Sequence, residues 1–304
     1  NRHMNYQNIK GVIVPLLTPF DEAGELNPAA LPPLIDYLIE RGVAGLFPLG
    51  TTGEGPLLTP DERQRLAEAV VRAAGGRVPV IVHTGDITTR GTIALTQHAQ
   101  AIGANAAAII TPYYFRLSNE ALIRHFQTVA EAVPDFPLYL YANPAVANNP
   151  LSSEVVIHLA ENTPNIIGLK DSSGSLDVLF TAKATLGDRF NTAIGPDSLI
   201  MTGIGNGLDA CVSGNANVVP ELVVALYNAA SRGDLATARE LQAKLDAVRR
   251  ILKDGADLSL YKGMMAKRGL PVGDVRAPLP QAPQAAIDAC WQALSALELH
   301  MTAL

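Results

Sequence analysis

Short apolar runs and longer stretches of helical periodicity alternate along most of the chain. The runs hold few polar residues, as expected for strands that are covered on both faces, and turn-forming residues follow them. The longer stretches repeat their apolar residues every three or four positions, which is typical of helices. The expected strands are 11–17, 43–49, 78–82, 106–110, 137–141, 166–170, 191–194 and 207–213.

The order of these elements indicates the fold class. A helical stretch follows each expected strand, so that strand and helix alternate over about 220 residues, a span typical of an α/β barrel. This pattern predicts an α/β fold, a (β/α)8 TIM barrel, with a doubly wound open sheet as the alternative. Three further helical stretches, 222–230, 235–252 and 285–297, predict a C-terminal helical extension. We therefore expect an N-terminal segment at 1–10, the barrel at 11–220 and C-terminal helices packed on it at 221–304.

Composition predicts a large core and excludes several classes of partner. Of the 304 residues, 48% are hydrophobic and 17% are charged, which is ample material for a core. The net charge of −6, without any lysine or arginine run, argues against nucleic acid as a partner. No apolar run is long enough to span a membrane and no signal peptide is recognised, so we expect neither membrane association nor export. Cys211 and Cys290 lack metal-ligand spacing and are interpreted as reduced residues of a cytoplasmic protein. Residues 1–4 are interpreted as the remnant of an expression tag.

One apolar run ends in a lysine. Lys170 follows Ile166, Ile167, Gly168 and Leu169 and precedes a cluster of small polar residues. Burial disfavours the charged form of an amine, and a neutral amine can form an imine with a ketone or an aldehyde. Lys170 is therefore the candidate nucleophile. The alternative is a solvated charge that turns outward at the end of the strand.

Most of the unusual polar and glycine clusters follow a strand directly. In a barrel the carboxyl ends of the strands share one rim, so these residues are expected to meet in one pocket with Lys170. Thr51 and Thr52 offer hydroxyls and backbone N–H groups that suit a carboxylate, although a tight strand-to-helix turn is the alternative. Tyr141 ends the strand beside that of Lys170 and is either a proton carrier or an aromatic residue that fills the barrel mouth. The expected pocket also contains Tyr114, Asp197, Ser213 and Asn215.

Two other titratable residues near expected strand ends are given no catalytic role. His83 lacks metal partners at useful spacing and is interpreted as a hydrogen-bonded structural residue. Asp171 is next to Lys170, but successive residues of a strand face opposite sides. Asp171 is therefore not counted as catalytic.

Four motifs stand in order along the chain: Gly50-Thr51-Thr52-Gly53-Glu54, Thr111-Pro112-Tyr113-Tyr114, Tyr141 with Pro144, and Gly168-Leu169-Lys170-Asp171. Together they resemble the dihydrodipicolinate synthase / N-acetylneuraminate lyase family. The resemblance extends from Gly11 to Leu279 and includes the segments Gly269-Leu270-Pro271-Val272-Gly273 and Arg276-Ala277-Pro278-Leu279.

The resemblance implies a class I aldolase, in which a lysine forms an imine with pyruvate or another 2-oxo acid without a metal or organic cofactor. It implies that Lys170 forms this imine, that Tyr141 carries protons, and that Thr51 and Thr52 hold the carboxylate. Thr51 and Tyr114 would complete the proton relay, with Tyr114 reaching into the site of a neighbouring subunit of a homotetramer or dimer. The other substrate-binding residues expected are Gly195, Asp197, Val212 and Ser213.

Two departures from the family pattern bear on the substrate. Members that condense pyruvate with aspartate semialdehyde carry an arginine in a Tyr-Asn-x-Pro-x-Arg-Thr-Gly pattern, and Val146 stands at its position here. An apolar side chain cannot hold a carboxylate by paired N–H bonds. Sialic-acid lyases carry acidic residues after the seventh strand. Asp197 matches one of them, and Ser198 replaces the second.

The predicted function is that of a Schiff-base-forming class I aldolase or lyase acting on a 2-oxo acid. The favoured reaction cleaves a 2-keto-3-deoxy sugar acid to pyruvate and an aldehyde. The alternatives are a dihydrodipicolinate synthase-like condensation of pyruvate with an aldehyde, dehydration of a 2-oxo acid through the same imine, and a non-catalytic pyruvate-binding barrel.

Overall fold

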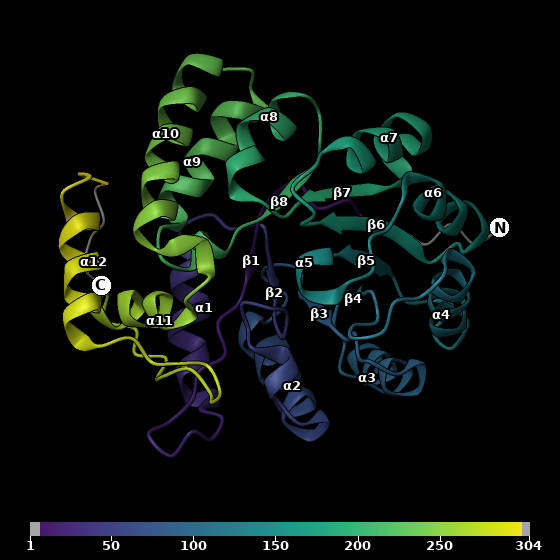
Figure 1. Ribbon diagram of the computed structural model, residues 1–304, viewed down its shortest axis with the longest axis horizontal. Coiled ribbons are helices and arrows are strands. Elements are labelled where there is room, and N and C mark those ends of the chain that lie inside the picture. Colours follow the sequence, from purple (N-terminus) through teal and green to yellow (C-terminus); the bar gives the residue numbers. More distant parts are fainter. Residues whose placement is uncertain (1–6, 300–304) are drawn as a thin grey trace.

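Eight parallel strands close into a barrel in the computed structural model, which describes residues 7–299 (Figure 1). β1 pairs with β8, and a parallel bridge from Leu46 in β2 to Val80, just before β3, closes the ring. This closure confirms the (β/α)8 barrel and excludes the open sheet. The tag interpretation of residues 1–4 lies outside the described residues. The strands are β1 Gly11–Pro15, β2 Gly45–Phe47, β3 Ile81–His83, β4 Ala106–Ile110, β5 Leu138–Ala142, β6 Ile166–Asp171, β7 Asn191–Ile194 and β8 Ala210–Val212.

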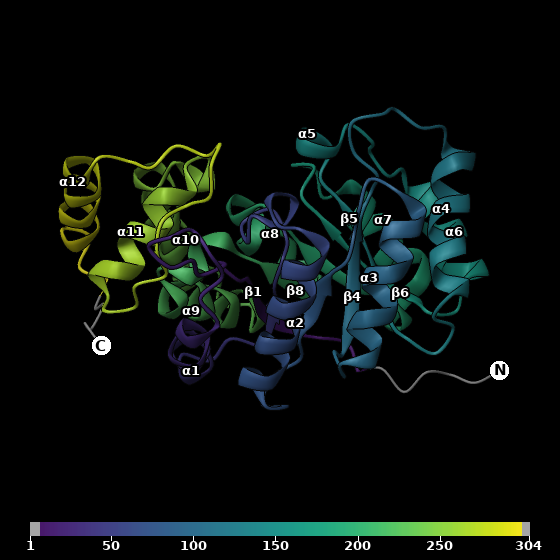
Figure 2. The ribbon, with the colours of Figure 1, turned by 90° about the horizontal axis from the view of Figure 1, so that it is seen from below.

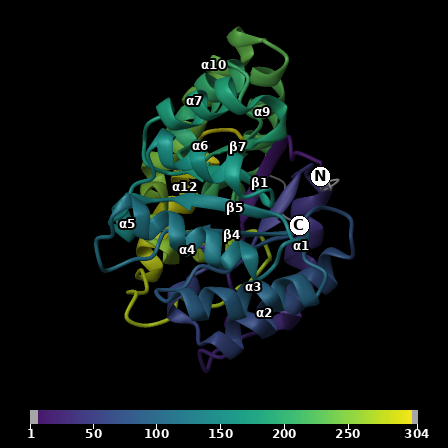
Figure 3. The same cartoon turned by 90° about the vertical axis from the view of Figure 1, so that its right-hand side faces the viewer.

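Helices follow the strands and cover the outside of the barrel, with α4 and α6 nearest the viewer in Figure 3. Several begin at a side-chain cap. The Thr59 hydroxyl accepts the Glu62 N–H at 3.2 Å, and the Glu62 carboxylate accepts the Thr59 N–H at 2.8 Å, which forms a capping box. No helix of residues 7–299 combines the length and apolar character that crossing a membrane requires. The outer helices are α1 Leu31–Glu40, α2 Pro60–Ala74, α3 Thr89–Ala101, α4 Asn119–Glu131, α6 Ser153–Asn162, α7 Asp177–Leu186, α8 Ile200–Gly205 and α9 Pro220–Ser231.

The C-terminal helices lie on the side of the barrel opposite α4 and α6 (Figures 1 and 2). They are α10 Leu235–Ile251, α11 Leu258–Lys267 and α12 Gln284–Ser295, and α10 packs along α9. The helix α11 was not predicted from the sequence. Because α9 contacts β1, it acts as the eighth outer helix of the barrel. The expected division of the chain at residue 220 stays a prediction.

The packing inside the barrel directs Lys170 inward. Tyr139 and Tyr141 of β5 both point into the barrel interior, where small residues of neighbouring strands leave room for them. A Cβ atom at Gly168 would lie 2.5 Å from the Tyr139 ring, so only glycine fits there. The pairing of β5 with β6 shifts at this point, because Leu138 pairs with Ile166 while Tyr139 pairs with Gly168. After this bulge, Tyr141 lies directly beside Lys170.

Candidate active site

Lys170 is buried in the mouth of the barrel. The residue is 8% exposed, and its Nζ atom lies 3.9 Å from the centroid of the Tyr141 ring and 5.1 Å from that of Phe47. The rings of Phe47, His83 and Tyr141 meet edge to face, with centroids 5.8–6.1 Å apart. This aromatic cluster, Phe47, His83 and Tyr141, excludes the alternative of a lysine that turns outward into solvent.

The Tyr141 hydroxyl links this buried amine to the surface of the site. It shares a hydrogen bond with the Thr51 hydroxyl at 3.2 Å and accepts one from the Asn143 amide at 3.3 Å. Burial raises the pKa of Tyr141. The positive charge of Lys170 and the hydrogen bonds with Thr51 and Asn143 outweigh this effect, so the pKa of Tyr141 lies below its usual value. A tyrosine with a lowered pKa exchanges protons more readily. Thr51 is exposed and Tyr141 is buried, so the pair can pass a proton between the interior and the solvent.

The loop that carries Thr51 and Thr52 is tied to the C-terminal part of the chain. Leu49 and Glu54 hold left-handed backbone angles, φ +70° and +57°, at its two ends. The Glu54 carboxylate is buried, pairs with the Lys262 ammonium of α11 at 2.8 Å and accepts the Arg276 N–H at 2.7 Å. These contacts fix the loop against the barrel mouth.

Tyr114 is not part of the cluster around Lys170. Its side chain is 77% exposed and packs edge-on against Phe115, with centroids 5.1 Å apart. The backbone of Tyr114 is left-handed, φ +77°, which is uncommon for a tyrosine. A role for Tyr114 in the site of a neighbouring subunit stays a prediction.

The remaining predicted substrate-binding residues lie around β7 and β8. Val212 is buried in the same interior cluster as Tyr141. The Gly195 N–H donates to the Asp171 carbonyl at 2.8 Å, which extends the sheet past β7. The Asp197 carboxylate accepts hydrogen bonds from the Ser213 hydroxyl at 2.8 Å and from the Asn215 amide at 2.6 Å.

Asp197 is enclosed by its partners instead of facing open space. Burial raises the pKa of the Asp197 carboxyl to about 6, although the hydrogen bonds from Asn215 and Ser213 act in the opposite direction. Neither Asp197 nor Ser213 is among the residues that line the cavity at the barrel mouth. Their contact with substrate stays a prediction.

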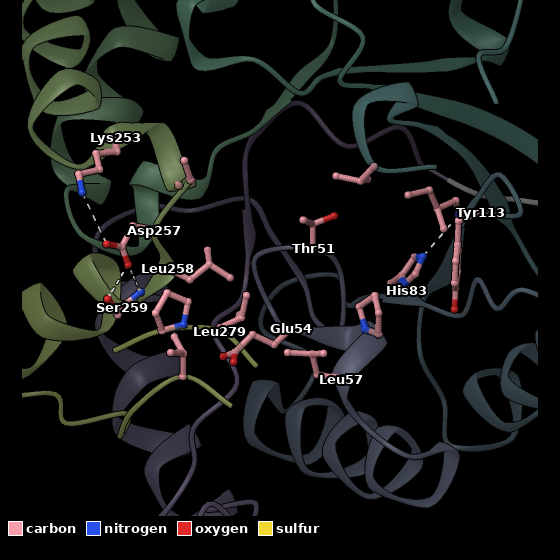
Figure 4. Close-up of a pocket in the computed structure, with 17 residues that line it drawn as sticks. Thr51, Glu54, Leu57, His83, Tyr113, Lys253, Asp257, Leu258, Ser259 and Leu279 are labelled. Atoms are coloured by element: carbon pink, nitrogen blue, oxygen red, sulfur yellow. Dashed lines mark hydrogen bonds and ion pairs between the residues drawn. The ribbon is translucent and has the colours of Figure 1, made fainter. Parts of the chain in front are cut away.

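A cavity of about 610 Å³ lies between the barrel mouth and the C-terminal helices. Figure 4 shows Thr51 between Leu258 and Ser259 of α11 on one side and His83 and Tyr113 on the other. Lys170 and Tyr141 are not among the lining residues, but Tyr141 contacts two of them, Thr51 through a hydrogen bond and His83 through its ring. The volume is in the range of small-molecule sites.

The sequence predicts only a structural role for His83, and in the structure this residue also lines the cavity. Its Nδ1 atom lies 2.9 Å from the Leu49 carbonyl, as expected for a structural histidine. Burial and the positive charge of Arg63 hold the pKa of His83 well below its usual value, so it presents a neutral ring to the cavity. Its position at the carboxyl end of β3 was the available signal. Within residues 7–299, no group of three or more histidine, cysteine, aspartate or glutamate side chains could hold a metal ion.

A (β/α)8 barrel with a buried lysine and a tyrosine on adjacent strand ends holds the groups that the imine chemistry of a class I aldolase requires. Residues 8–297 match the model of the Dihydrodipicolinate synthetase family, and the chain belongs to that family. The resemblance found from the motifs is thereby confirmed. The chain is accordingly a lyase of the Schiff-base class that acts on a 2-oxo acid.

Three known proteins illustrate the relationship. The chain is 41% identical over 277 residues to the 4-hydroxy-tetrahydrodipicolinate synthase of Thermomicrobium roseum, covering 90% of each chain. Among solved structures, YagE of E. coli K12, a prophage protein of the dihydrodipicolinic acid synthase family in complex with pyruvate, has a TM-score of 0.90 and 32% identity, covering 95% of this chain and 99% of its own. The N-acetylneuraminate lyase of Proteus mirabilis has a TM-score of 0.90 and 25% identity, covering 96% and 100%.

Proposed function

We propose that this chain is a pyruvate aldolase in which Lys170 forms the imine and Tyr141 carries the protons. One observation carries the proposal: the Lys170 amine lies 3.9 Å from the centroid of the Tyr141 ring, and the hydroxyl of that ring shares a hydrogen bond with Thr51, which lines a cavity. The complex of YagE with pyruvate supports pyruvate as the 2-oxo acid.

The chemistry follows from these positions. The Lys170 amine attacks C2 of pyruvate, and loss of one water gives a protonated imine, which acts as an electron sink. Removal of a proton from C3 yields an enamine. C3 of the enamine then bonds to the carbonyl carbon of an aldehyde, whose oxygen takes up a proton. Water hydrolyses the imine, which releases a 4-hydroxy-2-oxo acid and restores Lys170, and cleavage is the reverse sequence.

Tyr141 is suited to both proton transfers. Its hydroxyl lies beside the amine, and its lowered pKa favours loss and return of a proton. Thr51 and Thr52, in the loop held by Glu54, are placed by this proposal around the pyruvate carboxylate, where hydroxyls and backbone N–H groups offset the charge. The covalent imine makes a separate organic cofactor unnecessary for this route.

The assembly and location of the protein are part of the same proposal. Tyr114 and Phe115 form an exposed aromatic pair, 77% and 65% exposed, which suits burial against a second copy in a homodimer or homotetramer. A cytoplasmic location agrees with the absence of a disulfide at Cys211 and Cys290.

Deuterium exchange into pyruvate tests the function without knowledge of the aldehyde. An enamine exchanges the C3 protons with solvent, so the methyl signal of pyruvate in D2O should decay in proton NMR when the protein is present. The Lys170→Ala variant should show no exchange above the background. A non-catalytic pyruvate-binding barrel would bind pyruvate and leave the signal unchanged, and that result would contradict the proposal.

A further inference from the structure

The cavity above Lys170 is walled mainly by apolar side chains. Pro56, Leu57, Ile110, Leu258 and Leu279 are among them, and they come from both the barrel and the C-terminal segment. From this lining we infer that the aldehyde partner of the reaction is an uncharged, largely apolar aldehyde. The inference rests on the proposed function, because two lining residues, Thr51 and His83, contact Tyr141, the proposed proton carrier beside Lys170.

The described residues that line the cavity include one lysine, which is already paired with a carboxylate. Among the described lining residues, Lys253 is the one lysine or arginine, its side chain is 64% exposed, and its ammonium lies 3.8 Å from the Asp257 carboxylate. Glu54 is paired with Lys262, and His83 is neutral. A carboxylate on the aldehyde would therefore lose its hydration without gaining an ion pair, which is costly in an apolar site.

Val146 is an apolar residue of the cavity lining. It follows Tyr141 by five positions, belongs to the short helix α5 Pro144–Ala147 and is 51% exposed at the cavity edge. Its side chain offers methyl groups and no donor. A carboxylate or phosphate at that end of the cavity would have no hydrogen-bond partner on Val146, whereas an alkyl or aryl group would gain contact area.

The cavity also suits a polyhydroxylated aldehyde poorly. The Ser259 hydroxyl is already engaged, because it donates to the Asp257 carboxylate and accepts the Ala282 N–H at 2.9 Å. The Thr51 hydroxyl is engaged with Tyr141. Each sugar hydroxyl that entered this space would give up water for few partners. The sugar-acid substrate predicted from the sequence is therefore the rival that an experiment must separate from the apolar aldehyde.

The test compares aldehydes of similar length that differ in polarity. The protein and pyruvate are incubated with pentanal, with succinic semialdehyde, which ends in a carboxylate, or with glyceraldehyde, and the 4-hydroxy-2-oxo acid products are followed by mass spectrometry. We expect kcat/KM for pentanal to exceed both others by at least about tenfold, the scale on which an apolar pocket discriminates. Equal or faster turnover of succinic semialdehyde or glyceraldehyde would overturn the inference.

Deuterium exchange in the same preparation separates failure of the inferred aldehyde class from failure of the proposed function. If pyruvate exchanges and pentanal does not react, the aldehyde class is wrong while the proposed function stands. If pyruvate does not exchange, the proposed function fails, and the inference fails with it.

A pair of variants tests the part played by Val146. Val146→Arg should raise kcat/KM for succinic semialdehyde by at least about tenfold and lower it for pentanal, because an arginine can hold a carboxylate by two N–H bonds. Val146→Leu adds bulk without charge and should gain nothing with succinic semialdehyde. An arginine variant that gains no more than the leucine variant would overturn the assignment of Val146 to the aldehyde end of the cavity.

Discussion

Removing one oxygen atom from Tyr141 separates imine formation from proton transfer. In Tyr141→Phe the ring that packs 3.9 Å from the Lys170 amine is kept, and so are its contacts with Phe47 and His83. Only the hydroxyl is lost, together with its hydrogen bonds to Thr51 and Asn143. The lysine therefore keeps the aromatic rings around it, while the hydroxyl that interacts with it and carries the proton is removed.

The expected size of the effect follows from these contacts. Losing two hydrogen bonds at a site where Thr51 can turn to water costs about 1–2 kcal/mol of stability, which a folded domain tolerates. Losing a general acid–base group slows a reaction by about 10²–10⁴-fold, which corresponds to about 3–5 kcal/mol in the barrier. Proton exchange should thus fall far more than stability does.

Two measurements on the same variant make the distinction. Borohydride reduction should still trap pyruvate on Tyr141→Phe, while deuterium exchange into pyruvate should slow by about 10²-fold or more. Tyr139→Phe is the matched control, because Tyr139 also points into the barrel from β5 but donates its hydroxyl to Asn191. Its exchange rate should stay within about threefold of the parent, since it has no part in the general acid–base step.

Either of two results would refute this reasoning. Exchange by Tyr141→Phe within tenfold of the parent rate would remove Tyr141 from proton transfer. Loss of the trapped adduct in the same variant would show that the hydroxyl is needed for imine formation itself.

Two further predictions concern stability. Lys262→Met leaves the buried Glu54 carboxylate without its cation, so it should lower the free energy of unfolding by about 3–5 kcal/mol and Tm by roughly 5–10 °C. Lys267→Met breaks an ion pair at the surface and should change Tm by about 2 °C or less. Similar shifts in both variants by calorimetry would contradict this. Because the folded-state pKa of Asp197 is raised to about 6, its contribution to stability is fully present below the unfolded pKa and is lost as pH rises through about 6. The free energy of unfolding of Asp197→Asn, measured with urea at fixed protein concentration, should therefore rise by about 2–3 kcal/mol relative to that of the parent between pH 4 and pH 8. Parallel pH profiles of the two proteins would contradict this prediction.

The strands were predictable because each is an almost continuous apolar run, buried on both faces. β2 and β8 are shorter than expected, Gly45–Phe47 and Ala210–Val212, because the apolar residues that flank them are buried outside the paired ladder. Helix α11 was missed for the opposite reason. It is buried on nearly every side, from Ser259 to Met265, so it lacks the one-sided pattern that reveals a helix at the surface.

The site was only partly predictable. Lys170, Tyr141 and Thr51 could be grouped because strand ends share one rim of a barrel. The turn of Lys170 toward the interior depends on the bulge opposite Leu138 and on the Tyr139 ring, which are tertiary features. The wall formed by α11 could not be predicted at all, because it depends on contacts between residues far apart in the sequence, such as Glu54 with Lys262.

The most direct test of the central claim is to trap pyruvate on the protein with borohydride and locate the adduct by peptide mass spectrometry. We expect one pyruvyl group on the peptide that contains Lys170, and none in the Lys170→Ala variant. A protein that remains unmodified at saturating pyruvate, or that carries the group on another lysine, would contradict it.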